Sequence, residues 1–167
     1  MISYAALNLY NWFEENDIAI WIDGGWCVDA LLNFQTRKHE DLDIAVSRKD
    51  NIKLHELIEN DGWKEEKRDD CWECNYVMKS EGMYLIDVHV FEYDEQGKNI
   101  YGVPYPFGSF NGKGKINEQW VNCVNPECMF KFKLWADDTH CEPREKDIMD
   151  AQLLAEKFKF KLPENYR

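Results

Sequence analysis

One strand–turn–helix–strand segment near the N-terminus constrains the fold more than any other part of the sequence. Isoleucines alternate over 18–22, which predicts a short strand. Gly24 and Gly25 then interrupt the apolar pattern, and helical spacing predicts a helix over 26–34. A second strand is predicted over 41–46. The glycines therefore lie at a strand-to-helix turn, where backbone N–H groups can approach a phosphate closely.

Two aspartates alternate in the second of these strands. Asp41 and Asp43 are separated by one apolar residue, and residues two apart on a strand point to the same face. Such positions lie roughly 6.5 Å apart along the strand, close enough for two carboxylates to share divalent ions. A later apolar segment over 83–91 alternates in the same way and places Asp87 and His89 together on one face. The sequence thus predicts three carboxylates on two strands, a ligand set that suits Mg²⁺.

Each of these features is common when it occurs alone. A pair of alternating aspartates in an acidic chain is usually a solvated strand end, and a glycine pair is usually only a turn. An aspartate between apolar strand residues is more informative, because a charge there is unfavourable unless it is paired or bound to metal. Together and in this order, the three features are typical of a nucleotidyltransferase, in which two Mg²⁺ ions bridge the carboxylates and a nucleoside triphosphate.

The rest of the chain supplies further helices and strands. Helical spacing predicts helices over 1–15 and 49–60, one that begins at Asn125-Pro126-Glu127, and a last one that begins at Pro143 and leaves Lys146, Asp147 and Asp150 outside its apolar stripe. Strands are predicted over 63–67, 72–78 and 83–91, whereas 93–125 is rich in glycine and aromatic residues, with weak strand signals at 100–101 and 120–121. We expect one domain over 1–167, with a catalytic core (1–92), an acceptor-side loop and strand region (93–125) and a C-terminal helical part (126–167).

Composition limits the partners. The chain has 32 acidic and 20 basic residues and a formal net charge of −12, which argues against a general nucleic-acid surface. No apolar run approaches the roughly 20 residues that a membrane helix needs, and the N-terminus lacks a secretion signal, so we expect a cytoplasmic protein. Free thiols are then expected for its six cysteines: Cys27, Cys71, Cys74, Cys123, Cys128 and Cys141. Cys71 and Cys74 have zinc-knuckle spacing, but no second pair completes a site.

The same residues resemble a known family, the small antibiotic nucleotidyltransferases, which include the lincosamide nucleotidyltransferases and the related aminoglycoside 2″-adenylyltransferases. The resemblance is carried by Gly24-Gly25-Trp-Cys-Val-Asp29, by Gln35-Thr-Arg37-Lys-His39-Glu40-Asp41-Leu-Asp43, by Asp87 in Leu-Ile-Asp-Val-His, by Cys123–Glu127 and by Pro143–Asp150. It implies an α+β fold of the DNA-polymerase-β-like nucleotidyltransferase kind, a mixed sheet flanked by helices with C-terminal helices. Gly25 stands where many members have serine, so a serine contact to the phosphate is not available.

The resemblance also implies roles for individual residues. Asp41 and Asp43 resemble the metal ligands, and Asp87 resembles the third carboxylate, which acts as general base, metal ligand or both. Triphosphate binding is expected at Gly24, Gly25, Arg37 and Lys146. His39 and His89 are candidate proton acceptors or substrate contacts, and structural roles are equally ordinary for them. The other candidate substrate contacts are Glu40, Tyr101, Tyr105, Phe107 and Trp120, although the aromatic side chains can equally fill the core.

The acceptor is predicted chiefly from the resemblance. Chain length and the two N-terminal blocks are more similar to the lincosamide enzymes, which implies transfer of AMP from ATP to a hydroxyl of lincomycin or clindamycin and antibiotic resistance. Three alternatives stay open at this point: an aminoglycoside acceptor, a protein or tRNA target, and a nucleotide-binding module without catalysis. The net charge disfavours tRNA. A homodimer is compatible with the sequence.

Overall fold

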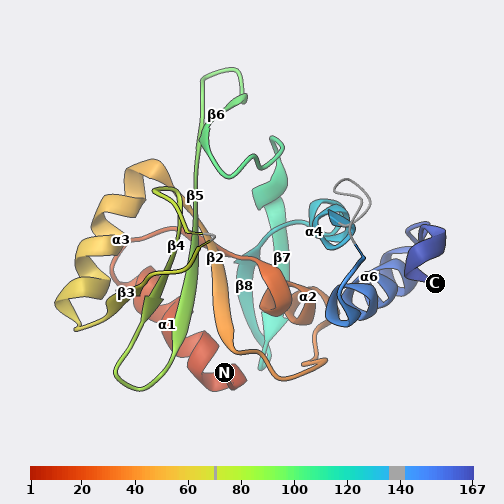
Figure 1. Cartoon of the computed structure of the whole chain (residues 1–167), viewed down its shortest axis with the longest axis horizontal. Coiled ribbons are helices and arrows are strands. Elements are labelled where there is room, and N and C mark those ends of the chain that lie inside the picture. The colour runs from red at the N-terminus through yellow and green to blue at the C-terminus, as the bar shows by residue number, and fades with distance from the viewer. Residues whose placement is uncertain (70, 136–141) are drawn as a thin grey trace.

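The computed structural model describes residues 1–69, 71–135 and 142–167. Within these residues, eight strands form one mixed sheet in the order β3-β4-β5-β2-β1-β8-β7, with β6 paired to β5 (Figure 1). The strands are β1 (Ile20–Ile22), β2 (Asp41–Ser47), β3 (Lys64–Glu66), β4 (Asn75–Lys79), β5 (Leu85–Tyr93), β6 (Asn99–Gly102), β7 (Gly112–Ile116) and β8 (Gln119–Cys123). The helices are α1 (Ser3–Glu15), α2 (Gly24–Leu32), α3 (Arg48–Asn60), α4 (Pro126–Lys133) and α6 (Glu145–Phe158), with short 3₁₀ turns η1 (Ser109–Asn111) and η2 (Glu164–Tyr166).

The centre of the sheet is a parallel pair of strands, β2 and β5, in which Asp43 lies opposite Asp87. β1 runs antiparallel to β2 and parallel to β8, so the sheet is mixed, as predicted. Leu42 and Ile44 are completely buried, as the alternation of β2 predicts. The opposite face of the same strand carries the two aspartates, which are partly exposed.

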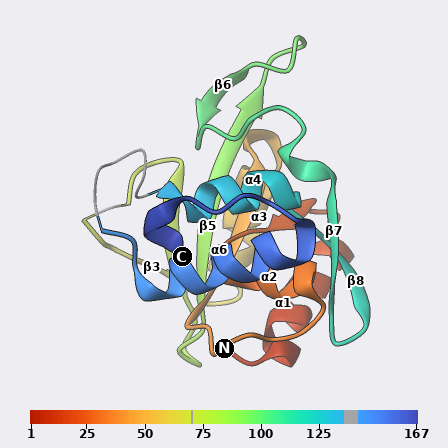
Figure 2. The ribbon, with the colours of Figure 1, turned by 90° about the vertical axis from the view of Figure 1, so that its right-hand side faces the viewer.

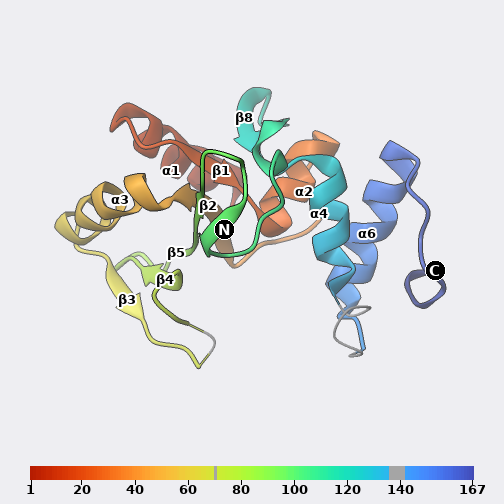
Figure 3. The same ribbon diagram turned by 90° about the horizontal axis from the view of Figure 1, so that it is seen from above.

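The helices pack in two groups. α3 packs against β2 and β5, and α1 packs against β1. α2 packs against β7 and β8 and contacts both α4 and α6. Figures 2 and 3 show α4 and α6 side by side near α2, and Figure 3 shows β3 on the opposite side of the molecule. The C-terminal helices are therefore attached to the sheet through α2, the helix that begins at the glycine turn. No helix in the described ranges is both long and apolar enough to cross a membrane.

Most predicted elements are present, with ends that differ by a few residues. Asn125 caps α4 as predicted, since its side chain accepts a hydrogen bond from the Cys128 N–H. The prediction for 93–125 missed β7, because its sequence Gly-Lys-Gly-Lys-Ile has almost no strand propensity. A Cβ at Gly114 would lie 2.4 Å from the carbonyl carbon of Ala30, so the glycine allows α2 to pack closely on this strand.

Candidate active site

Three carboxylates and one imidazole gather on β2 and β5. Donor atoms of Asp43, Asp87 and His89 lie within 4.8 Å of one another, and Asp41 lies two residues before Asp43 on the same strand. Burial, followed by the nearby charge of Asp41, raises the pKa of Asp43 to about 7. Grouped carboxylates of this kind are unfavourable without a cation. The oxygen-rich donor set fits a hard divalent cation such as Mg²⁺.

The glycine turn makes room for side chains of this site. Gly24 has a φ of +57°, and a Cβ there would lie 2.0 Å from Oδ2 of Asp43. A Cβ at Gly25 would lie 2.4 Å from Nδ1 of His39 and 2.7 Å from Nη2 of Arg37. The sequence indicated a turn open to phosphate. The structure adds that Asp43, His39 and Arg37 occupy the space that side chains at positions 24 and 25 would take.

His89 links the carboxylate cluster to a second buried aspartate. Its Nε2 lies 3.4 Å from Oδ1 of Asp87, and its Nδ1 lies 3.2 Å from Oδ2 of Asp23 and 3.0 Å from the Tyr105 hydroxyl, which itself donates to Asp23. Burial alone would lower the pKa of His89, but the two carboxylates raise it well above the usual value. When protonated, His89 would form ion pairs with Asp87 on one side and Asp23 on the other.

A polar cavity of about 500 Å³ opens over the carboxylates. Its basic lining residues come from four parts of the chain: Arg37, Lys38, Arg68, Lys133, Arg144 and Lys146. The remaining lining residues are Gly24, Gly25, His39, Glu40, Asp41, Asp43 and Asp87. Cations surrounding a metal-binding carboxylate cluster suit a nucleoside triphosphate, because its phosphate oxygens need both metal ions and basic side chains.

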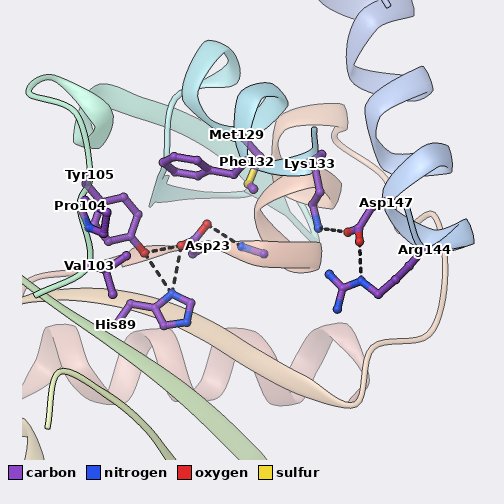
Figure 4. A pocket seen from close by; sticks show the side chains of 11 residues that line it. Asp23, His89, Val103, Pro104, Tyr105, Met129, Phe132, Lys133, Arg144 and Asp147 are labelled. Atoms are coloured by element: carbon purple, nitrogen blue, oxygen red, sulfur yellow. Dashed lines mark hydrogen bonds and ion pairs between the residues drawn. The ribbon is translucent and has the colours of Figure 1, made fainter. Parts of the chain in front are cut away.

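A second, mainly apolar cavity of about 330 Å³ adjoins the polar one. Figure 4 shows the side chains that line this apolar cavity. Gly24, Lys133 and Arg144 line both cavities. The apolar walls come from the segment after β6 and from α4: Val103, Pro104, Tyr105, Met129 and Phe132. Asp23, His89 and Asp147 complete the lining. A small molecule in this cavity would contact His89, whose Nε2 lies 3.4 Å from Oδ1 of Asp87 in the polar cavity.

Lys133 lies at the junction of the two cavities, a position that sequence reasoning missed. Its Nζ lies 2.9 Å from Oδ2 of Asp150 and 3.5 Å from Oδ1 of Asp147. Burial would lower the pKa of Lys133, but these carboxylates raise it. Nothing in the sequence pattern separates buried Lys133 from exposed Lys131. Asp147 and Asp150 lie outside the apolar stripe of the last helix, as predicted, yet both are fully buried because they pair with cations.

The structure brings most of the predicted site residues together. Nine of them line the polar cavity: Gly24, Gly25, Arg37, His39, Glu40, Asp41, Asp43, Asp87 and Lys146. Predicted residues His89 and Tyr105 line the apolar cavity. His39 also has a structural role, since its Nε2 lies 2.5 Å from Oδ2 of Asp29 on α2.

Three predicted aromatic contacts line neither cavity. The ring of Tyr101 on β6 lies 4.1 Å from the guanidinium carbon of Arg48. Phe107 is 76% exposed, and Trp120 on β8 is 62% exposed. The reason is that residues 93–125 do not form one acceptor loop: they divide into three strands, and only 103–105 returns to the cavity.

Acidic residues on adjacent parallel strands, a glycine turn at the start of a helix and a basic cavity above them define a nucleotidyltransferase. Residues 6–154 match the aminoglycoside-2″-adenylyltransferase family. The chain belongs to this family of antibiotic nucleotidyltransferases.

Relatives of both acceptor classes are similar to the chain. A lincosamide resistance protein of Staphylococcus haemolyticus is 26% identical over 136 residues, 78% of this chain and 83% of the relative. A 2″-aminoglycoside nucleotidyltransferase of Klebsiella pneumoniae is 37% identical over 127 residues, 75% of this chain and 69% of the relative.

Solved structures confirm the predicted fold. Lincomycin-bound LnuA, a lincosamide antibiotic adenylyltransferase, is 22% identical with a TM-score of 0.70, over 89% of this chain and 92% of LnuA. ANT(2″)-Ia in complex with adenylyl-2″-tobramycin is 22% identical with a TM-score of 0.69, over 93% of this chain and 85% of that one.

Proposed function

We propose that this protein transfers AMP from ATP to a hydroxyl of a lincosamide such as lincomycin or clindamycin, releases pyrophosphate and thereby confers antibiotic resistance. The observation that carries the choice of acceptor is the apolar cavity, which adjoins the polar one and has His89 in its wall. Its walls at Val103, Pro104, Met129 and Phe132 suit a molecule with an apolar part. A lincosamide has such a part and one basic amine, whereas an aminoglycoside is polar and carries several amines.

The charges around the apolar cavity support the same choice. Asp23 and Asp147 are the carboxylates in its described lining, and both already have partners. Asp23 accepts from Tyr105, His89 and the Gly24 N–H, and Asp147 accepts from Arg144 and Trp135. Lys133 and Arg144 add positive charge to the wall. A molecule with several amines would thus meet cations and already paired carboxylates.

The polar cavity supplies the donor half of the reaction. Arg37, Lys133 and Lys146 line this cavity and would hold the triphosphate, and Asp41, Asp43 and Asp87 would hold two Mg²⁺ ions. When bound, Mg²⁺ neutralises phosphate charge and makes the α-phosphorus more electrophilic.

The chain's own residues then move the proton. Asp87 accepts the proton of the acceptor hydroxyl, and His89 holds the Asp87 carboxylate in place through its Nε2. The hydroxyl oxygen forms a bond to the α-phosphorus, the bond from that phosphorus to the bridging oxygen breaks, and pyrophosphate leaves. The product is the AMP ester of the antibiotic.

One assay tests this proposal and its main alternative. Purified protein is incubated with Mg²⁺, labelled ATP and separate samples of lincosamides and aminoglycosides, and pyrophosphate release and the mass of each drug are measured. A mass gain of one AMP on a lincosamide is expected, and Asp43→Asn should abolish it. If none of the lincosamides gains the mass of AMP, the proposal is refuted. Product with aminoglycosides only would support the alternative that the Klebsiella pneumoniae relative, 37% identical, favours.

A further inference from the structure

We propose that Asp150, which lies outside the lining of both cavities, is a positioning residue that orients two triphosphate-facing cations, Arg37 and Lys133. The inference rests on the proposed binding of a nucleoside triphosphate in the polar cavity. It assigns to α6 a role in nucleotide binding.

A single oxygen of Asp150 joins three separate segments of the chain. Oδ2 lies 3.1 Å from Nη2 of Arg37 and 2.9 Å from Nζ of Lys133. Arg37 comes from the connection between α2 and β2, Lys133 from the last turn of α4, and Asp150 from the middle of α6. Both cations line the polar cavity, so the carboxylate lies behind them, on the side away from the cavity.

Burial makes this shared carboxylate necessary for the placement of both cations. The side chain of Asp150 is 0% exposed, and those of Lys133 and Arg37 are 9% and 22% exposed. Two cations this close repel each other, and a buried cation without a counter-charge is strongly unfavourable. Without the Asp150 charge, both flexible side chains should therefore turn toward solvent and leave the positions from which they face the cavity.

Each cation has a second polar partner, but among the described residues Asp150 alone forms an ion pair with both. Arg37 Nη1 lies 3.0 Å from Nδ1 of His39, and Lys133 Nζ lies 3.5 Å from Oδ1 of Asp147. Asp150 thus fixes the positions of Arg37 and Lys133 relative to each other.

The sign of the effect on binding separates positioning from simple charge. A long-range electrostatic effect predicts that removing an acidic group near an anion site strengthens anion binding. Positioning predicts the opposite, because the loss of Asp150 releases the two cations that contact phosphates. A purely structural role predicts a third result, an equal loss for nucleotides with one phosphate and with three.

The test measures binding of ATP and of AMP to the full chain by calorimetry, with Mg²⁺ and without antibiotic. Asp150→Asn should raise the Kd for ATP at least tenfold and change the Kd for AMP less than twofold. Asp150→Glu, which keeps the charge, should recover part of the ATP affinity. The control is Glu156→Gln, which removes an exposed acid from the same helix and should leave both constants unchanged.

A double-mutant cycle tests the route of the effect. If Asp150 acts through Arg37, Asp150→Asn should weaken ATP binding less in an Arg37→Gln background than in the wild type. Equal losses of ATP and AMP affinity, or an unchanged or tighter Kd for ATP in Asp150→Asn, overturn the proposal. If Asp150→Asn does not fold, the same comparison is made with Asp150→Ser, which also removes the charge, and wild-type ATP affinity there overturns the proposal. A wild-type protein that does not bind ATP overturns the proposed function as well, whereas ATP binding that Asp150 does not affect overturns only its positioning role.

Discussion

Replacing Gly24 with alanine tests whether the glycine turn serves to seat the Asp43 carboxylate. A Cβ at this position would lie 2.0 Å from Oδ2, 2.4 Å from Cγ and 2.9 Å from Cβ of Asp43. Because ordinary van der Waals contact begins at 3.4 Å, the carboxylate must move by more than about 1 Å. The φ of +57° adds backbone strain.

The chain offers a matched control in Gly62, which has a φ of +85° and open space within 4 Å of the position that a Cβ would take. Both alanine variants should lose about 1–2 kcal/mol of unfolding free energy, because both place an L-residue in the left-handed region. Only Gly24→Ala displaces a proposed metal ligand. A misplacement of about 1 Å near the chemistry can cost about 10²-fold, so its kcat/KM should fall about 100-fold, equivalent to about 2.7 kcal/mol of transition-state stabilisation.

Two measurements are compared for the two variants. Urea unfolding gives the free energies of unfolding, and pyrophosphate release gives kcat/KM. Binding of Mn²⁺ by calorimetry is a further readout that does not depend on the identity of the acceptor, and it should weaken in Gly24→Ala only. The reasoning is refuted if Gly24→Ala keeps near-normal turnover and metal affinity, or if Gly62→Ala loses as much activity as Gly24→Ala.

Other perturbations address the base, the acceptor cavity, a helix cap and acid stability. Asp87→Asn should slow AMP transfer at least about 10²-fold in a single-turnover assay, and a near-normal rate would exclude it as the base. Met129→Ala should raise the KM for the antibiotic without changing the Kd for ATP, since Met129 lines the apolar cavity only; an equal change in both would contradict this. Asn125→Ala should lower the urea-unfolding free energy by about 1 kcal/mol, because the Asn125 side chain caps α4, and an unchanged value would argue against the cap. Burial would raise the pKa of Asp147, but hydrogen bonds from Arg144 and Trp135 lower it. The contribution of ionised Asp147 to the free energy of unfolding is therefore fully present above a pH of about 4 and is lost in stronger acid. Asp147→Asn should therefore flatten the acid side of a thermal-stability profile, and an unchanged slope would count against this.

Local periodicity predicted the elements that carry the carboxylates. Residues two apart on a strand share a face in any fold, so the grouping of Asp41 with Asp43 and of Asp87 with His89 followed from spacing alone. β7 could not be found in this way. Its glycines are explained by the close approach of Ala30, a residue more than 80 positions earlier in the chain.

Roles that depend on contacts between distant segments were missed for the same reason. Lys133 and Asp150 look like surface residues in the sequence, and they become buried only because α4, α6 and the connection before β2 meet. Tyr101, Phe107 and Trp120 show the converse error. An aromatic-rich segment predicts that some rings contact the substrate, but strand pairing decides which rings reach the cavity. Of the four aromatic residues predicted as contacts, only Tyr105 lines the cavity.

A glycine turn, carboxylates on the same face of two strands and the residue blocks of an antibiotic nucleotidyltransferase could all be predicted from the amino-acid sequence. Such features depend on the geometry of a few consecutive residues. Three features became visible only in the folded chain: the parallel register that sets Asp43 opposite Asp87, the basic cavity and the apolar cavity beside it. Their physical origin is the packing of distant segments around one buried core, and no short stretch of sequence contains that information.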